Sequence, residues 1–150
     1  MNGAASRRRL LVIGAAATVL FHTRPAQADA AELAAAIRAF AGDAPVRAGR
    51  VRLDVAPLVE NGNTVPVTVS VDSPLTTADH VRSIALFNER NPQREVAVFT
   101  LGPRAGRAVV SARIRLATSQ QLVAVAKLSD GSCWSHTVDV VVTLAACVEG

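Results

Sequence analysis

The stretch Val65-Pro66-Val67-Thr68-Val69-Ser70-Val71-Asp72 alternates valine with proline or a polar residue, and it constrains the fold more than any other part of the chain. Successive side chains of a β-strand point to opposite faces, so the valines share one face. One apolar and one polar face is typical of a half-buried strand in an antiparallel sheet. Pro66 lies near the start of the strand, where a missing N–H is tolerated.

Six further segments have the composition of short strands. They are residues 51–55, 81–87, 95–100, 108–116, 121–128 and 133–144. Turn-forming residues separate them: Glu60-Asn61-Gly62-Asn63, Asn91-Pro92, Gly102-Pro103 with Gly106, and Asp130-Gly131. Seven short strands at this spacing predict an all-β fold, an immunoglobulin-like antiparallel β-sandwich.

One helix is expected before the strands. Residues 29–40 are good helix formers, and Leu33, Ile37 and Phe40 recur at a spacing that gives one apolar face. Asp29 is the predicted N-cap, and a glycine and a proline soon after residue 40 end the helix.

The first 28 residues have the features of an export signal. Arginines occupy positions 7–9, an apolar run covers 10–21, and Ala26-Gln27-Ala28 is a small-x-small cleavage site. The run is too short to span a bilayer stably. The paired arginines resemble a twin-arginine signal, and an ordinary secretory signal is the alternative.

Either signal places the mature chain, from about Asp29, outside the cytoplasm, most simply in a bacterial periplasm. The predicted organisation is an export signal over 1–28, a β-sandwich domain with its leading helix over 29–144, and a mobile C-terminal tail over 145–150.

The positive charge of the chain belongs to the signal. The formal net charge of +4 equals the four arginines that precede position 29, and no acidic residue precedes that position. The mature chain is therefore formally neutral, which removes the electrostatic basis for binding nucleic acid.

The usual catalytic and cofactor motifs are missing, so no catalytic residue and no cofactor is predicted. Cys133 and His136 point to opposite faces of a strand and cannot bind one metal ion without a bulge, and no haem-attachment motif is present. Cys133 and Trp134 are expected to be sandwich side chains, one on each face. Arg113 and Arg115 share one face of a strand, which indicates a solvated surface or a docking surface.

Cys147 is the one candidate reactive group, because it lies three residues from the end of the chain. A thiol on a short tail is a soft nucleophile that another protein's pocket can admit. A disulfide with Cys133, or an incidental free thiol, is the alternative interpretation.

Several segments, in this order along nearly the whole chain, resemble the SoxY family. They are residues 59–67, Asn91-Pro92, residues 112–117 and 123–126, Asp130-Gly131, Trp134 and a cysteine just before the C-terminus. SoxY is the sulfur-carrier subunit of the periplasmic thiosulfate-oxidising system.

The resemblance implies that Cys147 holds sulfur intermediates covalently while the chain, paired with a SoxZ-like subunit, visits separate enzymes. Those enzymes are a haem-containing thiosulfate-loading enzyme, a sulfate-releasing hydrolase and a sulfane dehydrogenase. The chain would then be a carrier and not an enzyme. The carrier arm would consist of Ala145, Ala146, Cys147, Val148, Glu149 and Gly150.

The arm departs from the family's usual ending, Gly-Gly-Cys-Gly-Gly. The flanking alanines, Val148 and Glu149 restrict the arm and add bulk and a negative charge beside the sulfur. Two alternatives therefore stay open: a carrier paralogue tied to a quinoprotein dehydrogenase route, and an immunoglobulin-like binding or structural module in which Cys147 forms an intermolecular disulfide.

An intramolecular disulfide depends on the last strand. If residues 133–144 form one continuous strand, about 10 residues at ~3.3 Å each hold Cys133 and Cys147 about 30 Å apart. A disulfide needs Cα atoms within about 7 Å. We therefore expect Cys147 to be free of Cys133.

Overall fold

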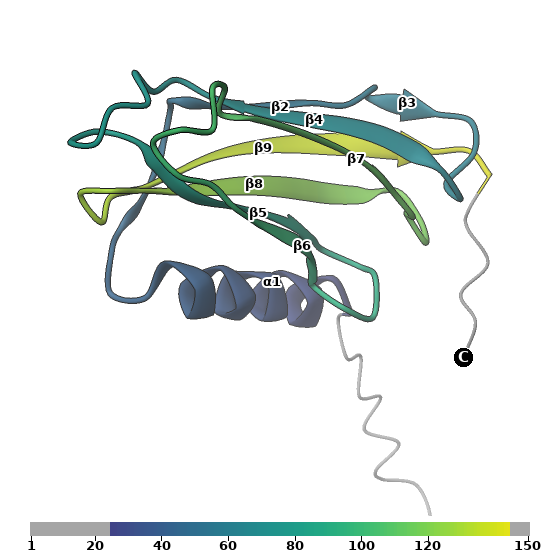
Figure 1. Cartoon of the computed structure of the whole chain (residues 1–150). Coiled ribbons are helices and arrows are strands. Elements are labelled where there is room, and N and C mark those ends of the chain that lie inside the picture. Colours follow the sequence, from purple (N-terminus) through teal and green to yellow (C-terminus); the bar gives the residue numbers. More distant parts are fainter. Residues whose placement is uncertain (1–24, 145–150) are drawn as a thin grey trace, which may run out of the picture.

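The computed structural model describes residues 25–144, which form three layers: one helix, a large sheet and a small sheet (Figure 1). The elements are α1 (Pro25–Ala41), β1 (Val46–Ala48), β2 (Val51–Asp54), β3 (Leu58–Val59), β4 (Val65–Val71), β5 (Val81–Asn88), β6 (Glu95–Thr100), β7 (Val109–Ile114), β8 (Gln120–Leu128) and β9 (Cys133–Val142). The large sheet lies between α1 and the small sheet (Figure 1).

The large sheet has the order β1-β9-β8-β5-β6, and β3 also pairs with β9. The small sheet has the order β2-β4-β7. Most pairs are antiparallel, whereas β1 and β3 each run parallel to β9. The chain passes from the large sheet to the small one at Gly49 and Arg50, whose φ angles of 120° and 55° make the sharp turn.

The core has two parts, one on each face of the large sheet. Val65, Val67 and Val69 of β4 face the large sheet, and they pack with residues such as Ile84 and Leu122. The alternation of β4 therefore has the predicted effect, since Pro66, Thr68 and Ser70 are on the more exposed face. The all-β prediction is confirmed as a two-sheet, sandwich-like fold, and the immunoglobulin-like assignment stays a prediction.

On the other face of the large sheet, α1 covers β5 and β8. Leu33 is buried there with Phe87, Val125 and Cys133. Phe40 meets Phe87 edge to face, with ring centroids 5.9 Å apart. Because helix covers one face and the small sheet the other, residues 122–126 of β8 are all buried and show no alternation.

The predicted N-cap of the helix is wrong. The helix begins at Pro25, whose fixed φ suits a first helical turn, so Asp29 is its fifth residue. The Asp29 carboxylate instead accepts a hydrogen bond from Arg94 at 2.9 Å, and Glu32 accepts one from the same guanidinium at 2.6 Å. The C-terminal end is as expected, with Gly42 at φ 69° directly after Ala41.

The strand predictions are confirmed for all seven segments to within about two residues at each end, and β6 has the predicted bounds. Two strands, β1 and β3, were not predicted, and both pair only with β9. Within the described residues, no helix is long and apolar enough to cross a membrane.

Candidate functional site

The predicted carrier arm lies outside the residues that the structure describes. This holds for Cys147 and for its neighbours Ala145, Ala146, Val148, Glu149 and Gly150. The structure does describe the backbone from which the arm starts, Thr143 and Leu144 at the end of β9.

The base of the arm is held by backbone hydrogen bonds to an edge segment of the molecule. Thr143 N–H donates to the Val59 carbonyl at 3.0 Å, and Gly62 N–H donates to the Leu144 carbonyl at 2.8 Å. The Gly62 carbonyl in turn accepts from Leu116 N–H at 2.8 Å. Thus the chain is fixed up to Leu144, and the position at which the arm begins is set by three separate parts of the sequence.

A polar cluster behind the arm base supports this arrangement. The Asn91 side chain donates to the Arg115 carbonyl at 2.7 Å and accepts from Ala117 N–H at 3.0 Å, so it fixes the segment on both sides of Leu116. It also accepts from Gln120 Nε2 at 2.7 Å. Gln120 is buried, so its side-chain amide needs a hydrogen-bond partner, and Asn91 provides one. The sequence indicated only a turn at Asn91-Pro92, since the partners of this amide are remote in sequence.

Cys133 is fully buried at the start of β9, under α1. Burial raises the pKa of the Cys133 thiol above its ordinary value, and the nearby positive charge of Lys127 acts in the opposite direction. A buried thiol with a raised pKa is a poor nucleophile. Cys133 is therefore a packing residue, as the sequence indicated.

The strand that separates the two cysteines is continuous from Cys133 to Val142. Its ends are about 30 Å apart at ~3.3 Å per residue. The five residues from Val142 to Cys147 span at most about 18 Å when fully extended, so even a tail that turned straight back would leave the Cα atoms about 12 Å apart. That exceeds the limit for a disulfide of about 7 Å, which supports the expectation of a separate Cys147 thiol.

Trp134 and His136 lie on the face of β9 opposite to Cys133, as predicted. Trp134 packs against the inter-sheet core. His136 Nδ1 accepts a hydrogen bond from Leu53 N–H at 3.0 Å and so joins β9 to β2. The part of the chain that the structure describes contains no group of three or more His, Cys, Asp or Glu side chains arranged to hold a metal ion.

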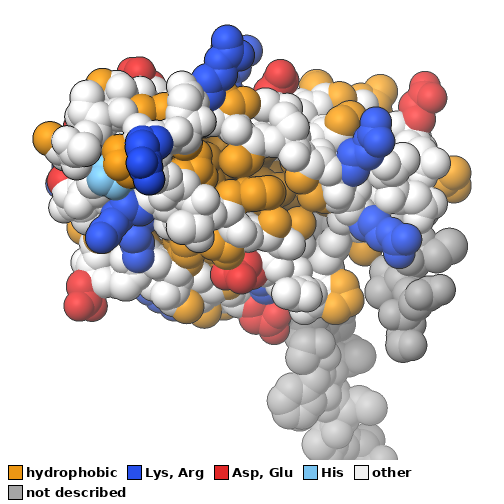
Figure 2. Space-filling model, viewed as in Figure 1, with side chains coloured by type: hydrophobic (Ala, Val, Ile, Leu, Met, Phe, Trp, Pro, Cys, Tyr) orange, Lys and Arg blue, Asp and Glu red, His pale blue; other side chains and the backbone are white. Residues whose placement is uncertain are grey.

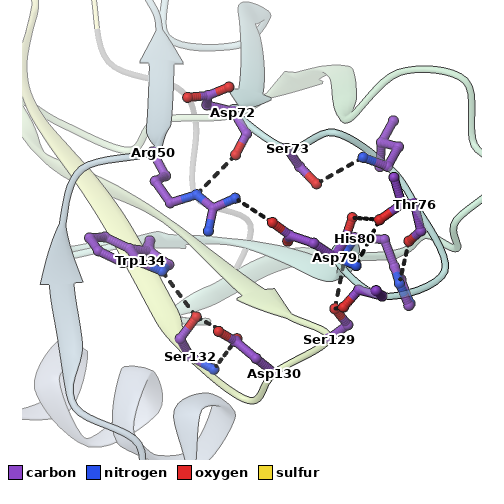
Figure 3. Close-up of polar contacts among 12 residues, drawn as sticks. Arg50, Asp72, Ser73, Thr76, Asp79, His80, Ser129, Asp130, Ser132 and Trp134 are labelled. Atoms are coloured by element: carbon purple, nitrogen blue, oxygen red, sulfur yellow. Dashed lines mark hydrogen bonds and ion pairs between the residues drawn. The ribbon is translucent and has the colours of Figure 1, made fainter.

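A second polar cluster lies at the end of β9 that is opposite to the arm base (Figure 3). Arg50 donates through Nε to the Asp72 carbonyl at 3.0 Å, pairs with Asp79 at 3.6 Å and lies 6.0 Å from the ring centroid of Trp134. Trp134 Nε1 donates to Ser132 Oγ at 3.1 Å. These groups satisfy one another within the chain, so the cluster is structural.

Three exposed apolar side chains near the arm base, missed by sequence reasoning, are Leu58, Val141 and Leu144, and together they are called the apolar patch here. Their side chains are the three most exposed large aliphatic ones in the described residues, at 58%, 53% and 62%. Leu58 and Val141 are register partners of β3 and β9. No signal in the sequence identifies the patch, because a two-residue strand has no periodicity.

Comparison with known proteins assigns the family. Residues 37–147, which include Cys147, match the family model described as sulfur oxidation protein SoxY. A structure of the sulfur carrier protein SoxY from Chlorobium limicola f thiosulfatophilum is similar at 31% sequence identity and a TM-score of 0.65, over 77% of this chain and 99% of that one. No curated protein matches the sequence.

Superoxide reductases share the fold at lower identity. The neelaredoxin from Ignicoccus hospitalis is 20% identical with a TM-score of 0.56, over 63% of this chain and 80% of that one. The enzyme from Nanoarchaeum equitans is 11% identical with a TM-score of 0.54, over 64% of this chain and the whole of that one. These likenesses concern the fold alone, whereas the family model covers most of the chain: this protein belongs to the SoxY family.

Proposed function

We propose that this chain carries sulfur intermediates covalently on Cys147 and catalyses no step itself. The observation that carries the proposal is the match to the SoxY family model, which extends to residue 147. The burial of Cys133 supports it, since the other cysteine is shielded from any reagent. The arm would consist of residues 145–150, beyond the hydrogen-bonded base at Thr143 and Leu144.

The proposed cycle assigns each chemical step to a separate enzyme. A haem-containing enzyme would join the outer sulfur of thiosulfate to Cys147 Sγ, as the thiol proton leaves and two electrons pass one at a time through the haem to an electron acceptor. A hydrolase would then add water across the bond to the sulfonate sulfur, which releases sulfate and leaves a persulfide. A sulfane dehydrogenase would oxidise that sulfane sulfur to a sulfonate with three oxygens from water and accept the six electrons. A second hydrolysis would then release sulfate and restore the Cys147 thiol. A thiol suits this role because sulfur–sulfur bonds form and break readily.

The partner is proposed to be a SoxZ-like subunit. Two edge strands, β6 of the large sheet and β7 of the small one, each pair on one side only within the described chain. Figure 2 shows apolar side chains in a hollow in the middle of the face where β6 and β7 lie in front in Figure 1. Edge strands of this kind are covered by pairing or packing with a similar domain. Joint elution of the two proteins in size-exclusion chromatography tests this, and separate elution well above micromolar concentration contradicts it.

The proposed location is the periplasm, after export by the twin-arginine route and cleavage near Asp29. The contacts of the helix are compatible with this cleavage, because Asp29 and Glu32, which both bind Arg94, would be retained. Replacing Arg7 and Arg8 with lysine should leave precursor in the cytoplasm. Normal export of that variant would contradict the twin-arginine assignment.

The carrier proposal is tested by locating sulfur on the folded protein. Tetrathionate reacts with a thiolate to form a cysteine S-thiosulfonate and to release thiosulfate, so uptake adds a defined mass. We expect the mass on the C-terminal peptide, where it should disappear in Cys147→Ser and persist in Cys133→Ser. A thiol alkylator should label the same peptide. Modification confined to Cys133, or an unreactive Cys147 in reduced protein, would leave the binding or structural module as the better description.

A further inference from the structure

We propose that the apolar patch of Leu58, Val141 and Leu144 is the surface on which the enzymes that act on Cys147 dock. The occupant would be the apolar rim of an enzyme pocket that admits the arm. This inference rests on the proposed carrier function and adds to it the place where a partner makes contact.

The patch is unusual in its exposure. Leu58 is 58% exposed, Val141 53% and Leu144 62%, whereas the other exposed large aliphatic side chains of the described residues, Val46, Val98 and Val109, are 37–45% exposed. Single exposed aliphatic side chains are common on protein surfaces. Here Leu58 and Val141 are direct register partners, so their side chains are neighbours on the same face of the β3–β9 pair. Two neighbouring exposed aliphatic side chains, with Leu144 close by along the chain, offer apolar surface that a partner can cover.

The patch is held in place by the backbone around it. Val141 N–H donates to the Pro57 carbonyl at 2.8 Å, which fixes β3 against β9. Leu144 is held through its carbonyl by Gly62 N–H at 2.8 Å. A surface that is already ordered loses little conformational entropy when a partner binds, which favours docking.

The length of the arm places any acting enzyme over the patch. Cys147 is the third residue after Leu144, so at about 3.6 Å per residue its Cα atom lies at most about 11 Å from that of Leu144. A pocket that receives the Cys147 thiol must therefore open within about 11 Å of Leu144. Val141 is three residues before Leu144, so the Val141 Cα atom lies within about 11 Å of the Leu144 Cα atom and within about 22 Å of the pocket opening. A specific interface covers roughly 800 Å² on each partner, so an enzyme seated there would contact the patch.

Polar residues border the patch in the way that they border an interface core. Asp139 lies two residues before Val141 on the same face and is exposed, with its carboxylate accepting from Gln121 Nε2 at 3.3 Å. Glu60 is exposed beside the arm base, where its carbonyl accepts from the Thr143 hydroxyl at 3.3 Å. The apolar centre with a polar rim fits a transient protein partner.

The test measures sulfate release from chemically loaded protein by the sulfate-releasing hydrolase of the same system. The mature chain, with its partner subunit if it has one, is loaded with tetrathionate at Cys147. The variant Leu58→Ser with Val141→Ser removes most of the patch. The control is Val46→Ser, an exposed aliphatic side chain on β1, away from the patch and from the two strands proposed to meet the partner subunit.

We expect kcat/KM to fall at least tenfold in the patch variant, through a raised KM, and to change less than twofold in the control. The rate at which a small alkylator labels Cys147 should be the same in all three proteins, because the thiol itself is unchanged. Leu144→Ser is a second variant, at a position after the last strand. It should also lower kcat/KM.

Failure of the docking surface and failure of the carrier function give different results. Wild-type kcat/KM in both the patch variant and Leu144→Ser, with sulfur loaded at Cys147, overturns the docking surface and leaves the carrier function standing. Loss of binding to the SoxZ-like subunit, or of a homodimer, assigns the patch to that contact and also overturns the docking surface. A wild-type protein that takes up no sulfur at Cys147 overturns the carrier function and the docking surface together.

Discussion

The two ends of β9 differ in how far the rest of the chain covers their large side chains. At the turn end, next to the β8–β9 hairpin, Trp134 is covered by Arg50 and donates to Ser132, so a large side chain is enclosed by groups of the same chain (Figure 3). At the arm end, Val141 and Leu144 are exposed although the backbone there is hydrogen-bonded. The exposure at the arm end is therefore a property of a well-held surface. The comparison indicates that one end contributes to stability and that the other leaves apolar side chains exposed.

The largest effect is expected at the turn end. Replacing Trp134 with Ala removes its packing on the inter-sheet core, its contact with Arg50 and its hydrogen bond to Ser132. Since a large aromatic residue truncated in a core costs about 3–5 kcal/mol and Trp134 is only partly buried, we expect a loss of about 3 kcal/mol. Urea unfolding followed by circular dichroism measures it. A loss under about 1 kcal/mol would show that the turn end does not differ from the arm end.

The next effect is at the polar cluster behind the arm base. Asn91→Ala removes three side-chain hydrogen bonds and leaves the buried Gln120 amide without one of its partners. We expect a loss of about 2 kcal/mol, because each bond contributes about 1 kcal/mol and the substitution allows some relaxation. Hydrogen exchange should also quicken at Leu116 and Gly62. Unchanged exchange at both amides would contradict the role of Asn91 in holding the arm base.

A smaller and pH-dependent effect is expected for Asp130 in the hairpin turn. The Ser132 hydroxyl and N–H donate to its carboxylate and lower its pKa below the usual value of 3.8. A lowered pKa in the folded state gives stability that is present above the ordinary pKa and is lost as pH falls through the folded value. We expect Asp130→Ala to lower the melting temperature slightly at pH 7, and we expect this difference from the wild type to shrink as the pH falls below the ordinary pKa. A difference that stays constant as the pH falls would exclude the ionised carboxylate as the cause.

The smallest effect on stability is expected at the apolar patch. Val141→Ser alters a side chain that is already 53% exposed, and surface substitutions usually change stability by less than about 0.5 kcal/mol. Equilibrium unfolding of Val141→Ser, measured in parallel with Trp134→Ala, compares the loss of stability at the two ends of β9 directly. A loss above about 1.5 kcal/mol would mean that Val141 is needed for folding, and the binding assays of the patch variant would then require the Leu144→Ser protein.

Prediction from sequence succeeded where local pattern and burial agree. The valines of β4 face the core because one side of the small sheet meets the large sheet, so alternation was a sufficient signal. Alternation gave less information for β8, because this strand is buried on both faces and its sequence is an apolar run. The N-terminal end of the helix was placed four residues late, because Asp29 serves an ion pair with Arg94, a residue remote in sequence.

The candidate site was predictable in one respect only. The burial of Cys133 can be inferred from its place in an alternating strand, and Cys133 is indeed buried. The patch and the hydrogen bonds at the arm base were not predictable. Leu58, Gly62 and Leu116 come to the end of β9 through pairings across the sheets, and no local pattern encodes them.

The sequence by itself determined seven of the strands and the two-faced helix, because these follow from side-chain periodicity. Only the tertiary structure decided that β3 pairs with the last two residues of β9, that Asn91 holds the segment beside Gly62, and that Leu58 and Val141 stay exposed near the arm base. The physical reason is that hydrogen-bond partners and exposure depend on which distant segments meet, and that is settled by packing of the whole domain.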